Sequence, residues 1–236
     1  MKSVNWTQYA QVYDLMTEVN PAYQELLGEF ETFLGKSGLQ AGQVLADLGA
    51  GTGNFSTLAA RSISGLEVIH IDGDPMMNAL AKTKDGGGKM RIQEGDLAEL
   101  NIGKAAYDAV VSVHALYTLS QPKEFLAKIA KGLKPGGKAF LCDLGRVLDI
   151  ADWRRFLMRK LIEERGLLQA GAIAWRGRKV ASENRRIASC QIDGRYWTHS
   201  HEEFREAVEQ AGMNILESRE AYRGYSDLVI AERRER

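Results

Sequence analysis

Three glycines follow the first strongly apolar run of the sequence at the spacing G-x-G-x-G. The run Val44–Leu48 leads into Gly49, Gly51 and Gly53, and a helical pattern follows at once. Glycine suits such a turn because it tolerates unusual φ values and lets a ligand approach the backbone closely. The dinucleotide fingerprint G-x-G-x-x-G would place its third glycine at Asn54, so the pattern departs from it. The loop therefore predicts a ligand that is held against the backbone.

Two acidic residues stand where the next two apolar runs end. Asp72 comes nineteen residues after Gly53, and a carboxylate at this place can accept hydrogen bonds from both ribose hydroxyls of an adenosine. Asp96 lies in the segment EGDL after the third run, where its carboxylate could accept the adenine amine while Leu97 lies against the ring. The simpler interpretation of each acid is a turn residue or a helix cap.

The elements that must position these residues alternate between strands and helices. From residue 44 onward, short apolar runs alternate with helical patterns, which is typical of an α/β fold with a parallel sheet covered on both faces. We expect strands at 44–48, 67–71, 90–93, 109–113, 138–142, 214–217 and 227–231. We expect helices at 55–62, 75–84, 122–133 and 201–211, one or two more in 7–34, and turns at 86–89 and 134–138. Asp74 and Ser200 are expected N-caps, the latter in a capping box.

Several segments in a fixed order resemble the class I S-adenosylmethionine-dependent methyltransferases: DLGAGTG, the acid of HIDGDPMM, EGDL, YDAVVSVHALYTL and LKPGG. The order and spacing agree over residues 44–142, and the elements at 200–232 are similar to the closing elements of that family. The resemblance implies a Rossmann-like seven-stranded sheet of order 3-2-1-4-5-7-6 with the last strand antiparallel. It also implies S-adenosyl-L-methionine as cofactor. The cofactor-binding residues that it implies are Tyr13, Asp47, Gly49, Ala50, Gly51, Gly53, Asp72, Gly73, Asp96, Leu97 and Ser112.

The resemblance divides one domain, 1–236, into four parts. Residues 1–40 form an N-terminal helical lid, 44–145 the cofactor-binding core, 146–198 an inserted substrate cap, and 199–236 the closing helix and strand pair. The cap segment is expected to be helical at first and irregular later. Its apolar residues Trp153, Phe156, Leu157, Leu161 and Leu168 recur at helical spacing. Such a helix could roof a substrate pocket, form a homodimer interface or lie on a membrane surface.

Charge distinguishes the cap from the remainder. The whole chain has 31 basic and 31 acidic residues, yet residues 151–200 hold eleven Lys and Arg against five Asp and Glu. A balanced total gives no field that attracts the molecule to nucleic acid, and we expect no nucleic-acid partner. The excess in the cap suggests that the acceptor is anionic, and an apolar acceptor is the other possibility that we keep. Two cysteines without metal-ligand spacing, no signal sequence and no apolar stretch of spanning length predict a cytoplasmic protein.

Missing motifs narrow the acceptor further. The fourth predicted strand is followed by His114-Ala115-Leu116 rather than the Asn/Asp-Pro-Pro-Tyr segment usual in nucleic-acid amino-methyltransferases, and neither cysteine follows a proline. The acidic set of the Mg²⁺-dependent catechol type is also missing, so no metal is expected. We therefore predict methyl transfer to O, N or C of a small-molecule metabolite. The alternatives are a methyltransferase acting on protein or RNA and a non-catalytic cofactor-binding regulatory protein.

Methyl transfer from a sulfonium needs mainly positioning, with removal of one proton at most. His114 is the candidate base because imidazole titrates near neutral pH, and Tyr117 is the weaker candidate. Packing is the simpler interpretation of His114. Tyr9 and Tyr13 are similar to the N-terminal segment that folds over the cofactor in many relatives, although both also suit the core of an amphipathic helix.

Overall fold

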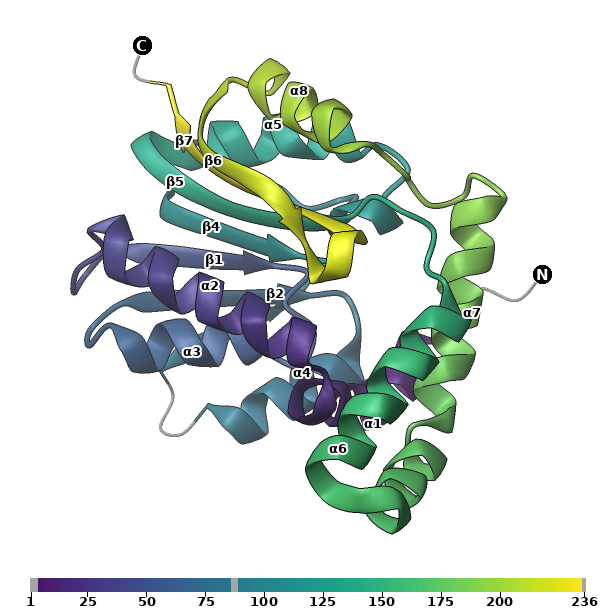
Figure 1. Ribbon diagram of the computed structural model, residues 1–236. Helices are drawn as coiled ribbons and strands as arrows, with labels where there is room; N and C mark the ends of the chain where they lie inside the picture. Colours follow the sequence, from purple (N-terminus) through teal and green to yellow (C-terminus); the bar gives the residue numbers. More distant parts are fainter. Residues whose placement is uncertain (1–3, 86–88, 235–236) are drawn as a thin grey trace.

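The computed structural model describes residues 4–85 and 89–234. Its seven strands form one sheet of order β3-β2-β1-β4-β5-β7-β6, and β7 runs antiparallel to β5 (Figure 1). The strands are β1 (Val44–Leu48), β2 (Glu67–Asp72), β3 (Met90–Glu94), β4 (Tyr107–Val113), β5 (Leu133–Leu144), β6 (Met213–Ala221) and β7 (Ser226–Arg233). The predicted fold class and strand order are confirmed.

Helices cover both faces of the sheet and bury a separate apolar core on each. Helices α2 (Pro21–Ser37) and α3 (Asn54–Ser62) cover one face, where Phe30 packs edge to face against both Phe55 and Phe140. Helices α5 (Pro122–Gly132) and α8 (His201–Gln210) cover the other, around Phe125 and Phe204. Because both faces are buried, the central strands are apolar on both sides, which is what the sequence pattern indicated.

Sequence signals for helix ends hold at two places. Asp74 begins α4 (Pro75–Lys84) and accepts hydrogen bonds from the backbone N–H groups of Met76 and Met77. Ser200 begins α8, and its hydroxyl accepts from Glu203 N while the Glu203 carboxylate accepts from Ser200 N. Both caps satisfy backbone donors that a helix start leaves unpaired.

The two expected turns have different outcomes. Residues 86–88 of the first lie outside the described part. The second, 134–138, falls within the bounds of β5, which starts at Leu133 and pairs with Tyr107 before the register shifts. The residues that predicted a turn therefore form an irregular start of the strand, with Gly136 at φ 72°.

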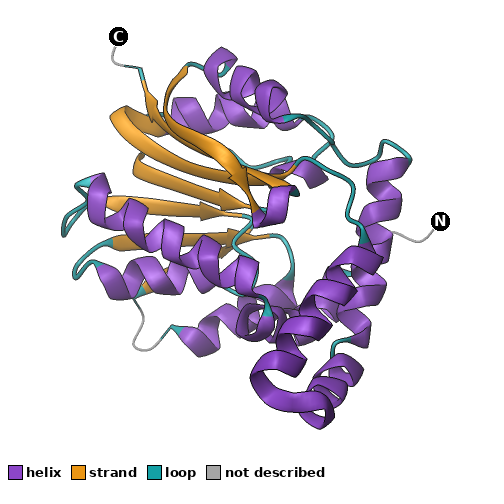
Figure 2. Cartoon of the chain, in the orientation of Figure 1, coloured by secondary structure: helices purple, strands orange, loops and turns teal. Residues whose placement is uncertain are grey.

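Three helices lie beyond the carboxyl ends of the strands: α1 (Trp6–Val19), α6 (Ile150–Arg176) and α7 (Arg178–Ile192) (Figure 2). The expected irregular second half of segment 146–198 is wrong, since α7 is regular over fifteen residues. Its buried face, with Val180 and Ile187, packs in the larger core. Tertiary packing of this kind outweighs weak local helix signals.

The first helix of the cap is interrupted where a glycine stands. Gly166 has φ 78° and ψ 166°, so α6 consists of two helical pieces that meet at this residue. Trp153 and Leu161 of the predicted apolar face are buried, whereas Leu168 is 90% exposed. The break explains the difference, because helical spacing no longer relates Leu168 to the residues before Gly166.

In the described part of the chain, no helix is long and apolar enough to cross a membrane.

Candidate active site

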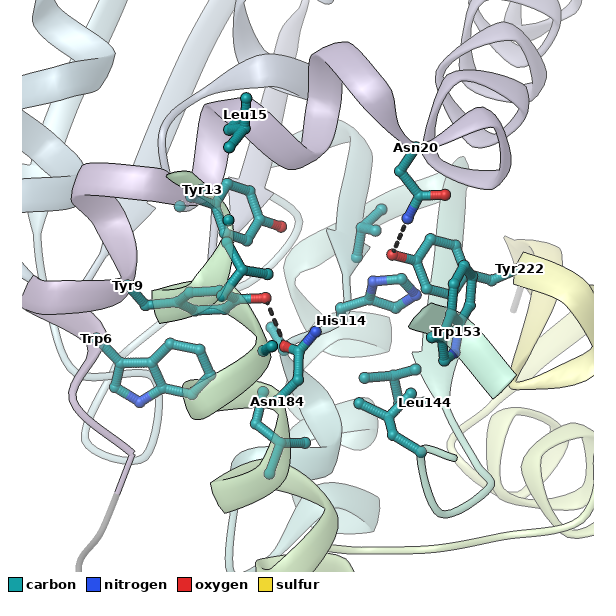
Figure 3. Close-up of a pocket in the computed structure, with 18 of the residues that line it drawn as sticks. Trp6, Tyr9, Tyr13, Leu15, Asn20, His114, Leu144, Trp153, Asn184 and Tyr222 are labelled. Atoms are coloured by element: carbon teal, nitrogen blue, oxygen red, sulfur yellow. Dashed lines mark hydrogen bonds between the residues drawn. The ribbon is translucent and has the colours of Figure 1, made fainter. Parts of the chain in front are cut away.

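A cavity of about 610 Å³ lies between the carboxyl ends of the strands and the helices α1, α6 and α7 (Figure 3). The predicted site residues that line it are Tyr13, Gly49, Gly51, Asp72, Gly73, Asp96, Leu97, His114 and Tyr117. Four others, Asp47, Ala50, Gly53 and Ser112, do not line it. The structure thus brings residues from five separate segments to one cavity.

The three glycines of the loop have positive φ for different reasons. At Gly51 (φ 56°) an added Cβ would meet nothing nearer than the Met77 sulfur at 4.0 Å, so open space lies over this backbone. At Gly49 (φ 74°) an added Cβ would lie 2.4 Å from Ala115 Cβ, and at Gly53 (φ 77°) 2.9 Å from Ala81 Cβ. Gly51 is therefore the place where a ligand can approach the backbone, whereas the other two glycines permit close packing.

Asp72 is the last residue of β2 and lines the cavity next to the glycine loop. One carboxylate oxygen accepts a hydrogen bond from Gly51 N at 2.8 Å, and the other accepts from Asp74 N at 2.9 Å. Burial raises the pKa of this carboxyl above its usual value, while the two backbone bonds act in the opposite direction. The two bonds fix the carboxylate where its remaining lone pairs can accept further donors.

A buried polar chain supports the loop from behind. Ser56 Oγ donates to Asp47 Oδ2 at 2.6 Å and lies 3.1 Å from His70 Nδ1, and His70 Nε2 lies 3.1 Å from Asn78 Oδ1. Asn78 Nδ2 then donates to the carbonyl oxygen of Asp72. Burial raises the pKa of Asp47 to about 7 and lowers that of His70 to about 4. Asp47 therefore positions the loop from within the protein, and any direct part in binding the methionine portion stays a prediction.

Ala50 and Ser112 both make hydrogen bonds with main-chain groups of the protein. The carbonyl of Ala50 accepts from Gly53 N at 3.0 Å and closes the turn, and the hydroxyl of Ser112 donates to Leu48 O at 2.9 Å and joins β4 to β1. Ser112 is fully buried. Their predicted contacts with a cofactor remain predictions.

The segment after β3 borders the same end of the cavity. Asp96 Oδ1 accepts from Ala98 N at 2.9 Å, so this acid also caps a turn, as the simpler interpretation held. Leu97 is buried, and its side chain reaches the space beside Gly49. An apolar side chain and a carboxylate that stand together beside the loop suit the ring and the amine of an adenine.

His114 lies at the centre of the cavity (Figure 3). Its backbone has φ 52°, a conformation that residues other than glycine rarely adopt. Nε2 lies 2.8 Å from Ser226 Oγ, and the ring packs edge to face on Tyr222 at 4.7 Å. Burial lowers the pKa of the imidazole to about 3, so it is neutral and only weakly basic at neutral pH. A neutral hydrogen-bonding or packing group fits this environment better than a general base.

Tyr117 is a poorer base still. The side chain is buried against Tyr196, with ring centroids 5.3 Å apart, and burial raises its pKa well above the usual value. Tyr9 and Tyr13 of α1 pack edge to face at 5.3 Å on the opposite side of the cavity from Trp153 and Tyr222 (Figure 3). Both tyrosines line the cavity and also belong to the packed core, so the two interpretations of them coexist.

Sequence reasoning missed the contacts that hold α1 over the cavity. Lys84 Nζ donates to Asp14 Oδ1 at 2.7 Å, to Thr52 Oγ1 at 2.9 Å and to Asn54 Oδ1 at 2.8 Å. Thr52 Oγ1 donates to Asp14 as well, at 2.6 Å. One lysine thus joins the helix α1, the glycine loop and the end of α4. The sequence offers no local signal for this, because the partners are 30 to 70 residues apart.

Two further bonds fix α1 at its other end. Thr7 Oγ1 donates to Asp74 Oδ2 at 2.6 Å, and Tyr9 OH donates to Asn184 Oδ1 of α7 at 2.8 Å. Helix α1 therefore contacts both the cofactor side of the cavity and the cap.

The cap contributes an almost wholly apolar wall. Its lining side chains are Ile150, Trp153, Leu157, Met158, Leu161, Ile173, Val180 and Ile187, with Leu144 and Leu148 from the segment before α6. The charged cap residues in the lining are Arg154 and Arg178, both exposed. Arg186 instead pairs with Glu183 at 2.5 Å, and neither it nor Arg185 lines the cavity. The basic excess of the cap thus lies mainly outside the cavity, which counts against the expected anionic acceptor.

Comparison with known proteins agrees with this geometry. Residues 46–141 match a family model described as a methyltransferase domain. An uncharacterized methyltransferase of Geobacillus sp. (strain WCH70) is 29% identical over 139 residues, 58% of this chain and 64% of that protein. A demethylmenaquinone methyltransferase of Tropheryma whipplei (strain Twist) is 33% identical over 109 residues, 45% of this chain and 44% of that protein. The chain thus matches less than two thirds of the length of these relatives.

Solved structures extend the likeness to the whole fold. A chain of the complex between the Haloferax volcanii Trm112 methyltransferase activator and a methyltransferase gives a TM-score of 0.67 at 18% identity and covers all of both chains. A SAM-dependent methyltransferase from Aquifex aeolicus gives 0.60 at 18% identity, over 93% of this chain and 97% of that one.

Residues 46–141 thus match a methyltransferase domain, and the fold of the whole chain is that of the S-adenosylmethionine-dependent methyltransferases. The domain match and the fold agree with the predicted family and with S-adenosylmethionine as its cofactor. The site also fits that cofactor, because open space lies over Gly51 and the carboxylate of Asp72 faces the cavity beside it.

Proposed function

We propose that the protein transfers the methyl group of S-adenosylmethionine to an apolar small molecule that occupies the cap end of the cavity. One observation carries the proposal: a single cavity joins the loop at Gly51 and Asp72 to the apolar wall formed by α6 and α7. A cofactor held at the first end would present its methyl group toward the second. Apolar side chains favour an apolar acceptor, since burial of a charged one against them would be costly.

The chain's own residues then have two tasks. Asp72, Asp96 and the glycine loop hold the nucleoside and amino-acid portions, and the cap wall orients the acceptor and excludes water. S-adenosylmethionine supplies an electrophilic methyl group on a sulfonium, so positioning accounts for most of the catalysis. His114 lies between the two ends and can donate or accept a hydrogen bond as a neutral imidazole.

A methyltransferase acting on protein or RNA is the alternative. The Haloferax volcanii neighbour is bound to Trm112, which is named there as a methyltransferase activator, so a partner protein is a further possibility to test. The cavity favours a small acceptor, since α1, α6 and α7 all border it and α1 is fixed to both sides. Several relatives are named demethylmenaquinone methyltransferases, and that compound is therefore the first acceptor to test.

The test is methyl transfer from radiolabelled S-adenosylmethionine into a cell extract, followed by separation into organic, protein and RNA fractions. The proposal predicts label in the organic fraction, and Asp72→Ala should remove it. Label in the protein or RNA fraction would establish the macromolecular alternative. Cofactor binding without label in any fraction would indicate a non-catalytic regulatory protein.

A further inference from the structure

The far end of the cap, residues 159–179, gathers apolar side chains on its surface. Of the seven large apolar side chains that are exposed in the described part of the chain, four lie in this cap tip: Ile162, Leu167, Leu168 and Trp175. Leu167, Leu168 and Trp175 are 70%, 90% and 69% exposed. Scattered apolar residues on a surface need no explanation, but a cluster of this kind marks a place of interaction.

The backbone of α6 explains how these side chains come to point outward. Gly166 interrupts the helix, and the piece after it turns back at the bottom of Figure 1, away from the sheet. Leu168 and Trp175 are seven residues apart, so they lie on one side of this piece. Ile173 and Ala174 line the cavity. The short helix therefore has one apolar side toward the cavity and another toward the outside.

The segment that carries the exposed apolar side chains is also rich in basic ones. Residues 159–179 hold six basic side chains, Arg159, Lys160, Arg165, Arg176, Arg178 and Lys179, and two acidic ones, Glu163 and Glu164. The guanidinium of Arg178 stacks on the Trp175 ring at 4.2 Å. Outside residues 151–200, acidic residues outnumber basic ones. The cap tip is thus a positively charged, apolar projection on an otherwise acidic molecule.

We propose that the cap tip docks on the surface of a membrane that contains anionic lipids. Leu168 and Trp175 would insert among the headgroups and upper acyl chains, as Leu and Trp side chains do at such interfaces. Arg176 and Lys179 would contact lipid phosphates, and the acidic remainder would be repelled, so that the molecule is oriented with its cap downward.

Continuity with the cavity favours a lipid surface over a protein partner. Ile173 lies on the helix that carries Trp175, and it lines the cavity in which the proposed acceptor is methylated. An apolar acceptor dissolved in the bilayer would reach the cavity through the docked tip without crossing water. This route rests on the proposed function, whereas docking itself does not.

The experiment is co-sedimentation of the protein with vesicles of phosphatidylcholine alone and of phosphatidylcholine with phosphatidylglycerol. We expect binding to the anionic vesicles to be at least about tenfold stronger, and to weaken as salt screens the headgroup charge. Blue-shifted fluorescence on binding, lost in Trp175→Phe, would place that residue at the interface. Equal binding to both vesicles, or binding to neither, would overturn the proposal.

Variants separate the cap tip from a general affinity for lipid. Leu168→Ser with Trp175→Ser, and independently Arg176→Glu with Lys179→Glu, should each weaken binding at least about tenfold. All four side chains are exposed, so folding should not change. Leu216→Ser, half exposed on β6, and Arg61→Glu with Lys104→Glu, exposed elsewhere, are the matched controls and should bind as the natural chain does.

Two readouts distinguish this proposal from others. If the tip variants bind vesicles normally but change the molecular mass in solution, the tip is an interface between two copies and the proposal is wrong. Calorimetry with S-adenosylhomocysteine should give the same affinity in the tip variants as in the natural chain. Vesicle binding that survives alongside a failure of methyl transfer would count against the proposed function alone.

Discussion

The two ends of the cavity are built in opposite ways. The cofactor end is made of backbone: glycines at positive φ, carboxylates that accept backbone N–H groups, and strand ends that meet at one edge. The cap end is made of apolar side chains from long helices. Backbone geometry restricts residue type strongly, whereas an apolar wall tolerates many sequences of similar volume. The first end can therefore be recognised from the sequence, whereas the second, where we propose that the acceptor binds, cannot.

The largest effect should come from the backbone end. Gly51→Val should abolish S-adenosylhomocysteine binding, because the new side chain would fill the open space over the loop. Gly38→Val is a matched control, since Gly38 also has positive φ (77°) and open space around it but lies outside the cavity. Both variants carry a similar backbone strain, so calorimetry should show loss of binding in the first alone. Normal binding by Gly51→Val would mean that the loop does not hold the cofactor.

A smaller loss of cofactor affinity is expected where a side chain, not the backbone, holds the ligand. Asp72→Ala removes a charged acceptor, and hydrogen bonds to charged groups contribute about 1.5–3 kcal/mol each, so affinity for S-adenosylhomocysteine should fall at least about tenfold. The control is Asp85→Ala, because Asp85 also accepts two backbone N–H groups, from Lys89 and Met90, outside the cavity. Equal affinities in the two variants would refute the ribose assignment.

The sequence predicts the two ends unequally, and for a physical reason. Local patterns, and a resemblance that extends over residues 44–142, predict the sheet order, the helix N-cap at Asp74 and the position of Asp72. They do not predict the bonds of Lys84, because its partners are 30 to 70 residues away along the chain. The break in α6 was not predicted either, although a glycine that can adopt φ 78° stands there. The expected irregular end of the cap failed because α7 is stabilised by burial of Val180 and Ile187, not by local signals.

At the cap end, a polar substitution should weaken binding of the acceptor and leave binding of the cofactor unchanged. Leu157→Asn places an amide in the apolar wall, and an unpaired polar group costs about 1–3 kcal/mol. The KM of the acceptor should therefore rise by roughly tenfold while the affinity for S-adenosylhomocysteine stays the same. Leu216→Asn, half exposed on β6, is the control and should change neither value. An acceptor KM that rises with salt instead, and after charge reversal at Arg154 and Arg178, would restore the anionic acceptor.

Between the two ends, His114 should make a modest contribution. Removal of a true general base costs about 10²–10⁴ in rate. Because the pKa of His114 is lowered to about 3, we expect His114→Gln to reduce kcat by less than about tenfold and to leave the pH profile without an inflection between pH 5 and 8. A loss of 10² or more, together with an inflection that the variant removes, would show that His114 is the base after all.

The smallest effect, on stability, should appear where the cap joins the remainder of the chain. Arg146 is the first residue of the cap and His199 the first residue after it, and both side chains contact the buried carboxylate of Asp227. His199 Nδ1 lies 3.3 Å from Asp227 and Nε2 3.6 Å from Asp143, and the ring stacks on Phe204 at 4.8 Å. Burial acts to lower the pKa of His199, but the two carboxylates prevail and raise it to about 9.

This raised pKa has a definite consequence for stability. A proton bound more tightly in the folded state stabilises it fully below the unfolded pKa of about 6.5, and the contribution is lost as pH rises toward about 9. The melting temperature should therefore fall by roughly 5–10 °C between pH 6.5 and 9. His199→Gln, which cannot carry the charge, should be less stable at pH 6.5 and lose this pH dependence. His201→Gln is the control, because its ring lies partly exposed and 2.8 Å from the same Asp227, so this variant removes a contact to that carboxylate while His199 stays in place. An unchanged slope in His199→Gln would mean that another group titrates at the junction.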